Sequence, residues 1–142
     1  MKKFLRDILN DISNYRYYQN KISEINMSIY RLRLIMGGVK GISFDGDKLE
    51  NASSNKDQLY LDSIEKIDKL KAKRNEYLAK VALVEYVIKK VKGEARIYII
   101  EHYLQDKTLV EIAEARGVTA RRIGQIIEKG VEEVYEGNES DV

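Results

Sequence analysis

The sequence predicts an all-α protein in which a long antiparallel, coiled-coil-like helical hairpin precedes a C-terminal three-helix domain with a helix-turn-helix. Three observations support this fold class. The 142 residues include no proline, and 34% of them are charged against 8% aromatic, a balance that favours long solvent-exposed helices over strands. Apolar residues also recur every three or four positions along much of the chain. We expect the hairpin over residues 1–93, the three-helix domain over 94–137 and a tail over 138–142.

The first twelve residues, MKKFLRDILNDI, predict an amphipathic helix. Their apolar residues are interrupted by Arg6, Asp7 and Asp11, which is unlike a secretory signal peptide. No stretch is apolar for long enough to cross a membrane, so we expect no membrane partner. The absence of cysteine excludes disulfides and cysteine-based metal sites, and it favours a cytoplasmic protein.

Two seams, in which the spacing alternates between three and four residues, predict the arms of the hairpin. The first seam consists of Tyr18, Ile22, Ile25, Ile29, Leu32 and Met36. The second consists of Ile67, Leu70, Arg74, Tyr77, Val81, Val84, Ile88 and Val91. The glycine-rich polar stretch at about residues 37–56 is expected to be a flexible loop between them. The two seams most simply pair within one chain, and a homodimer is the alternative.

Three tyrosines stand close together at the start of the first seam. Tyr15, Tyr17 and Tyr18 point in different directions around a helix, so they cannot all face one seam. At least one of them should therefore be exposed or contact another chain.

The segment after Gly93 predicts the three helices of the C-terminal domain. The first is ARIYIIEHYLQDKT, with Ile97, Ile100 and Leu104 at helical spacing. Thr108, with Glu111 three residues later, predicts the N-cap of the second helix. The remainder, up to Gly130, reads as two short helices joined by a tight turn.

Within that turn, Gly117 can adopt a left-handed backbone at low cost, and Thr119 is a suitable N-cap for the last helix. The residues expected to pack inward are Ile112, Ala113, Val118, Ile123, Ile126 and Ile127. This arrangement is typical of a helix-turn-helix, and it makes double-stranded DNA the expected partner.

The last helix carries the candidate DNA-binding residues. They are Thr119, Ala120, Arg121, Arg122, Gln125, Glu128 and Lys129. Arginine can bond guanine bidentately, glutamine can bond adenine, and lysine and hydroxyl groups can bind phosphates. The alternative interpretation is a surface helix with ordinary charges on an interaction domain.

Three features depart from a typical DNA-binding motif. Arg116 stands where a buried aliphatic residue is usual, so its stem should pack while its guanidinium reaches outward. Gly124 costs the last helix about 1 kcal/mol relative to alanine. Residues 1–93 carry 19 Lys and Arg against 12 Asp and Glu, whereas residues 94–142 carry 6 against 11. An acidic C-terminal half counts against tight, stand-alone DNA binding.

The stretch ARIYIIEHYLQDKTLVEIAEARGVTARRIGQIIEKGVEEV resembles the promoter-recognition region 4 of bacterial sigma-70 factors. The matching residues are His102, Tyr103, Leu104, Asp106, Lys107 and Thr108, then EIAEARGVT, then Arg121 and Arg122. A helical hairpin before such a region is similar to small phage and prophage regulators related to late-gene activators of Gram-positive phages. The resemblance implies promoter DNA binding and action on RNA polymerase in a bacterial host cell.

We therefore expect a DNA-binding transcriptional regulator of phage or prophage origin. The alternatives are an RNA polymerase-binding protein that contacts DNA little, and a recognition subunit for phage DNA packaging. We expect that the protein is not an enzyme and binds no cofactor or metal, because His102 is the only histidine and no glycine-rich loop ends in GK[ST]. Asp45 and Asp47 lack the other ligands of a calcium loop.

Overall fold

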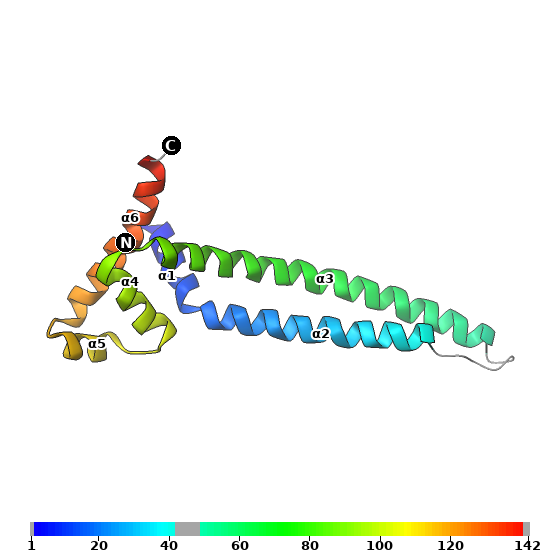
Figure 1. Ribbon diagram of the computed structural model, residues 1–142. Helices are drawn as coiled ribbons and strands as arrows, with labels where there is room; N and C mark the ends of the chain where they lie inside the picture. Colours follow the sequence, from blue (N-terminus) through cyan, green and yellow to red (C-terminus); the bar gives the residue numbers. More distant parts are fainter. Residues whose placement is uncertain (1, 42–48, 141–142) are drawn as a thin grey trace. The chain divides into compact units, whose positions relative to one another are not determined.

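The structure is a computed structural model that describes residues 2–41 and 49–140, and the described residues contain helices and no strand. The α-helices are α1 (Lys3–Ser13), α2 (Tyr15–Gly41), α3 (Leu49–Lys90), α4 (Gly93–Ile99), α5 (Leu109–Arg116) and α6 (Ala120–Ser140). A π-helical segment, η2 (Ile100–Leu104), directly continues α4 (Figure 1). The prediction of an all-α protein is confirmed.

The chain divides into two compact units. Unit 1 comprises Met1–Tyr18 and Ala79–Val142, and unit 2 comprises Gln19–Leu78. This division differs from the expected boundary between residues 93 and 94. The reason is that α1 and the last turns of α3 share one core with α4, α5 and α6.

In unit 2, α2 and α3 run side by side in opposite directions (Figure 1). Ile25, Ile29 and Ile67 are buried between them, and the half-buried residues packed against this cluster are Leu32, Met36, Leu70 and Tyr77. All of these residues belong to the predicted seams. Arg74, the polar residue in the second seam, donates a hydrogen bond from Nη1 to Asn26 Oδ1 at 2.8 Å.

The predicted loop at about residues 37–56 is shorter than expected. Helix α2 continues to Gly41 and α3 already begins at Leu49, so both helices extend into this stretch. The glycines at the end of α2 do not stop the helix as they were expected to. Residues 42–48, which include Asp45 and Asp47, lie outside the described residues.

In unit 1, a single hydrophobic core joins five helices. Its most deeply buried side chains are Ile12 on α1, Val84 and Val87 on α3, Ile99 on α4, Ile112 on α5, and Ile123 and Val131 on α6. Burying one such side chain stabilises the fold by about 1.5–3 kcal/mol. The N-terminal amphipathic helix is therefore part of the C-terminal domain's core, because Leu5, Ile8 and Ile12 face inward together.

The three neighbouring tyrosines take three environments, as their spacing predicts. Tyr18 is buried and donates to Asp11 Oδ1 at 2.7 Å. Tyr15 is half-buried and donates to Glu85 Oε1 at 2.7 Å. Tyr17 is 51% exposed.

Helices α5 and α6 are joined by a short turn with defined caps. Thr108 Oγ1 accepts a hydrogen bond from the Glu111 amide at 3.1 Å, and Thr108 thus caps α5 as predicted. Gly117 has φ 69°, and the Val118 amide donates to the Ala113 carbonyl at 3.1 Å, the hydrogen bond of a Schellman motif. Such a turn requires a left-handed residue, which explains the glycine.

Packing around this turn differs from the sequence prediction in two places. Ile112, Ala113, Ile123 and Ile127 are buried as expected. In contrast, Val118 is 41% exposed and does not fill the corner, because the turn directs it to the surface. Ile126 is only half-buried, since it lies toward the edge of the inward stripe of α6.

Helix α6 is longer than predicted. It passes through Gly130 and ends at Ser140, so the first residues of the expected tail are helical. The cause is that the buried stripe continues from Ile123 and Ile127 to Val131 and Val134, which extends the contact with the core beyond the motif.

Candidate nucleic-acid interface

The predicted DNA-binding residues fall into two groups on α6. Arg121, Arg122, Gln125 and Lys129 are exposed along its outer face. Thr119 is also exposed, at the start of the helix. Its Oγ1 accepts a hydrogen bond from the Arg122 amide at 3.1 Å, which forms the predicted cap. A cap of this kind stabilises the first turn of the helix, which carries both arginines.

The other two predicted residues lie apart from this face. Ala120 is half-buried and packs against the core. Glu128 is half-buried on the side of α6 toward Tyr103. Burial raises the pKa of Tyr103, and the negative charge of Glu128 adds to this rise. The outer face thus consists of Arg121, Arg122, Gln125 and Lys129, with Thr119 at its end.

The cations of this face have no ionic partner in the part of the chain that the structure describes. Among the described residues, no carboxylate lies within 4.0 Å of the charged groups of Arg121, Arg122 or Lys129. Some other cations of unit 1 are engaged, since Lys2 pairs with Glu132 at 2.8 Å and Arg16 pairs with Asp106 at 2.6 Å. Unpaired exposed cations remain available to an anionic partner.

Arg116, the unusual residue of the motif, stabilises the three-helix packing. Its Nη2 donates to Glu101 Oε1 at 2.8 Å, and its guanidinium carbon lies 5.7 Å from the centre of the Tyr98 ring. The Glu101 side chain is only 16% exposed, whereas the Arg116 side chain is 43% exposed. The sequence analysis expected the guanidinium to extend into solvent. Instead, it connects α5 to α4 and η2 through its contacts with Tyr98 and Glu101.

The connection from η2 to α5 is held by α2. Arg16 donates to Asp106 Oδ2 at 2.6 Å and to the Leu104 carbonyl. Asp106 has φ 58°, a left-handed conformation that is uncommon for a residue other than glycine. His102 Nδ1 is 2.7 Å from the Lys107 carbonyl, so the histidine bonds within this connection. These contacts fix the position of α5 and hence the start of α6.

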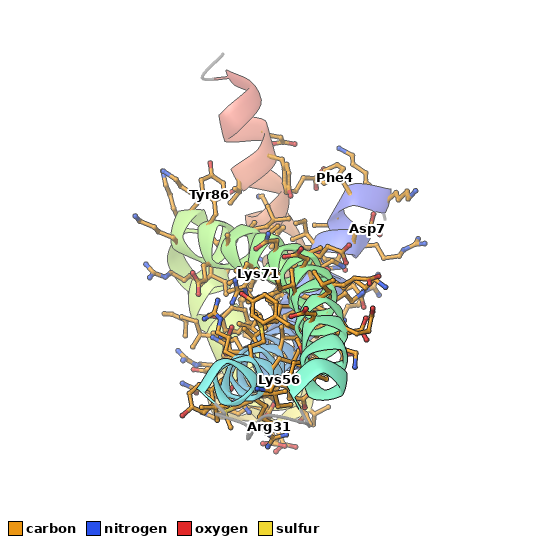
Figure 2. All side chains as sticks on the ribbon, turned by 90° about the vertical axis from the view of Figure 1, so that its right-hand side faces the viewer. Phe4, Asp7, Arg31, Lys56, Lys71 and Tyr86 are labelled. Carbon is orange, nitrogen blue, oxygen red and sulfur yellow. The ribbon has the colours of Figure 1, made fainter. Side chains whose placement is uncertain are left out.

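The second half of α6 differs from the first half in charge. The ring of Phe4 on α1 contacts the Tyr135 ring in a tilted arrangement, with an interplanar angle of 59° and ring centres 4.9 Å apart, and Phe4 lies near α6 in Figure 2. Glu132 is held by Lys2, while Glu133 and Glu136 are exposed. Positive charge is thus concentrated at the leading end of the helix, and negative charge follows it.

The outer face borders a shallow hollow of about 370 Å³ between α6 and the start of α4. Its lining consists of Lys92, Glu94, Ala95, Arg122, Gln125, Ile126, Lys129, Gly130 and Glu133. Sequence reasoning did not identify Lys92 and Glu94. No sequence signal identifies them, because the hollow forms where α6 approaches Ala95 closely at Gly130, and these two residues are distant in the sequence.

No known protein family, curated protein or solved structure matches the chain. Within the described residues, no three His, Asp or Glu side chains come together as a metal site. None of the described helices has the length and apolar run that a membrane crossing requires.

Proposed function

We propose that this protein is a DNA-binding transcriptional regulator in which α5 and α6 act as a helix-turn-helix. The observation that carries the proposal is the set of exposed cations on the first half of a capped helix, Arg121, Arg122 and Lys129, which have no ionic partner among the described residues. The second helix of such a motif enters the major groove with its N-terminal residues toward the base edges. The resemblance to sigma-70 region 4 supports action at promoters of the kind that phages and prophages regulate.

Each exposed side chain has a distinct role in this proposal. Arg121 and Arg122 approach guanine edges, and Gln125 approaches adenine. Lys129 and, beside it across the hollow, Lys92 bind the phosphates that flank the groove. Base contacts give sequence preference, whereas the phosphate contacts mainly raise affinity for any duplex.

The test begins by selecting bound fragments from random DNA with the full chain. Binding of the selected duplex is then measured by fluorescence anisotropy for Arg121→Ala and Arg122→Ala. Each variant should weaken binding about 5- to 150-fold, which corresponds to about 1–3 kcal/mol for a base-reading arginine. Arg6→Ala is the matched control, because it removes an exposed arginine from α1 of the same unit. Affinities of both α6 variants equal to that of the control would contradict the proposal.

The salt dependence separates base recognition from simple charge attraction. With two to four phosphates neutralised, the logarithm of the association constant should fall with the logarithm of salt concentration with a slope of about −2 to −4. Lys129→Ala should make this slope less steep by about one unit and weaken all duplexes equally. A chain that shows no salt-dependent duplex binding does not have the proposed function.

The exposed acids on the second half of α6 favour a second candidate, docking onto RNA polymerase with little DNA contact. Glu133 and Glu136 offer a negative surface to a basic partner. Capture of purified RNA polymerase by the full chain, lost in Glu133→Gln/Glu136→Gln and retained in Arg121→Ala, would select this candidate.

A further inference from the structure

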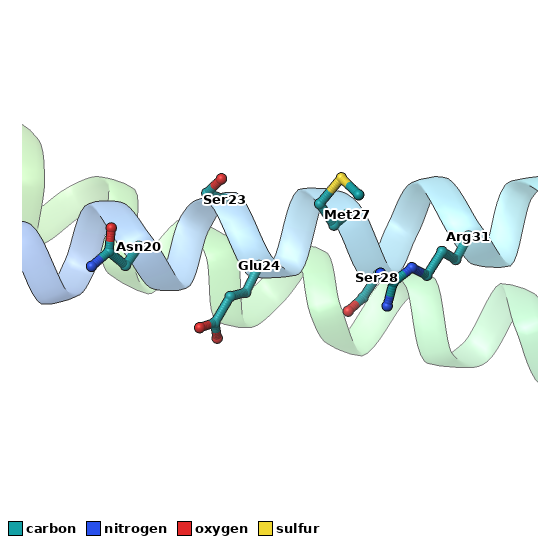
Figure 3. Close-up of a pocket in the computed structure, with 6 residues that line it drawn as sticks. All are labelled: Asn20, Ser23, Glu24, Met27, Ser28 and Arg31. Atoms are coloured by element: carbon teal, nitrogen blue, oxygen red, sulfur yellow. The ribbon is translucent and has the colours of Figure 1, made fainter.

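The side of α2 that faces away from α3 carries large apolar side chains in unit 2. Met27 is 50% exposed, Tyr30 is 58% exposed and Leu34 is 56% exposed. Figure 3 shows Asn20, Ser23, Glu24, Met27, Ser28 and Arg31 along this face, which forms an open, shallow surface. We call the stripe through Met27, Tyr30 and Leu34 the outer seam.

The outer seam has the spacing of a coiled-coil interface. It runs through Asn20, Ser23, Met27, Tyr30, Leu34 and Gly37, with intervals alternating between three and four residues. At about 100° per residue, its centre is about 150° around the helix from the buried seam that faces α3. Helix α2 therefore has one seam that is filled within the chain and a second that is not filled by the described residues.

The charges beside the outer seam indicate what fills it. Glu24 and Arg31 flank the same side of the stripe, seven residues apart. Two antiparallel copies of α2 can be placed so that Met27 of each copy packs beside Tyr30 of the other. In this register each Glu24 faces Arg31 of the second copy, which gives two equivalent ion pairs. A parallel pair would instead place Glu24 opposite Gln19, and Arg31 opposite Asn26.

The present environment of these two charges fits such a partner. Among the residues that the structure describes, Glu24 pairs only with Lys21 of its own helix, at 3.2 Å, a surface pair of little energetic value. Arg31 has no carboxylate within 4.0 Å among the described residues. An isologous two-fold contact uses one patch twice, and this patch is complementary to itself.

We propose that the outer seam of α2 is the interface of an antiparallel homodimer, with Glu24 of each copy paired to Arg31 of the other. The proposal does not depend on DNA binding, because the residues lie in unit 2 and the candidate DNA-binding face lies in unit 1. Its failure would leave the function of α6 untouched.

The mass of the full chain, measured by sedimentation equilibrium over a range of concentrations, tests the interface. The wild type should form dimers, and Leu34→Glu should form monomers because it places two carboxylates in the apolar stripe. Leu61→Glu is the matched control, since Leu61 is 59% exposed on α3 and should leave the dimer intact. A monomeric wild type, a ring-sized oligomer, or a dimer unaffected by Leu34→Glu would overturn the proposal.

Charge reversal tests the pairing. Glu24→Arg and Arg31→Glu should each weaken dimerisation about tenfold, because both ion pairs become like-charge contacts. The double variant Glu24→Arg/Arg31→Glu should restore it, and circular dichroism should show that all three variants keep their helix content. A double variant as weak as the singles would contradict the proposed pairing.

The direction of the helices can be measured independently. The chain contains no cysteine, so Asn20→Cys provides a single site for a nitroxide spin label. In the antiparallel register the two Asn20 positions are about 17 residues apart along the axis, or about 26 Å at 1.5 Å per residue. A label separation near 10 Å would indicate a parallel dimer and overturn the proposal.

Discussion

Gly130 on α6 is the position where the packing of unit 1 is most sensitive to one added carbon. A Cβ at this residue would lie 2.4 Å from Ala95 Cβ and 3.3 Å from Val91 Cγ1. The first distance is far shorter than a van der Waals contact, and Ala95 cannot rotate away because its side chain is a single methyl group. Gly130→Ala must therefore push α6 away from the start of α4.

Two opposing effects determine the size of the change. Replacing a glycine inside a helix by alanine gains about 0.5–1 kcal/mol. Overpacking a close contact costs about 1–3 kcal/mol. Gly124 separates the two effects, because it lies on the same helix and a Cβ there meets nothing within 4 Å. Gly124→Ala should stabilise the protein by about 0.5–1 kcal/mol, and Gly130→Ala should be less stable than Gly124→Ala by about 1–3 kcal/mol.

The free energy of unfolding of the full chain is measured by urea titration with circular dichroism at fixed protein concentration. The double variant Gly130→Ala/Ala95→Gly removes the shortest contact, so the two changes should be less damaging together than the sum of the single changes. If Gly130→Ala proves as stable as Gly124→Ala, the close approach of α6 to Ala95 is refuted.

Two further predictions concern polar contacts of unit 1. Arg116→Ala leaves the mostly buried Glu101 carboxylate without its 2.8 Å partner, and it should lower the free energy of unfolding by about 1 kcal/mol in the same urea assay; no loss would mean that this pair does not hold α5. Burial is the larger cause, and the hydrogen bond to Glu85 is the next, of a rise in the pKa of Tyr15 from 10.0 to about 12. A raised pKa stabilises the folded state fully below pH 10, and this stabilisation is lost as the pH rises from about 10 to 12. Tyr15→Phe should therefore reduce the fall in melting temperature over that pH range, and an unchanged fall would contradict the assignment.

The sequence predicted the features that local chemistry determines. Thr108 and Thr119 were identified as caps because a hydroxyl before an apolar periodic run accepts an amide of the first turn, and both do so. Gly117 was identified as the turn residue, and it has the left-handed backbone expected of it. The spacing also predicted the residues that pack between α2 and α3 in unit 2, whereas Val84, Ile88 and Val91 of the second seam pack in the core of unit 1.

Features that depend on contacts distant in sequence could not be predicted. Nothing around Gly130 in the sequence shows that Ala95 lies against it. Arg116 was expected to extend into solvent. Its contact with Glu101 could not be predicted, because Glu101 lies 15 residues earlier and on another helix. The length of α6 was underestimated, because the predicted segment extended only to Gly130, whereas this glycine lies inside the helix at the close contact with Ala95.

The charge balance of the candidate interface depends on which residues fold together. Residues 94–142 alone carry five more acids than bases, which counts against tight DNA binding. Unit 1 also contains residues 1–18 and 79–93, and counting it as a whole gives 14 Lys and Arg against 14 Asp and Glu. Lys2 and Arg16 neutralise Glu132 and Asp106 directly, while Arg121, Arg122 and Lys129 stay unpaired. A neutral unit with a few such cations on the first half of one helix attracts phosphates weakly over a distance, so most of its affinity for a duplex must come from direct contacts of that half. This is why the proposed function requires a shallow salt dependence together with a large effect of single arginines.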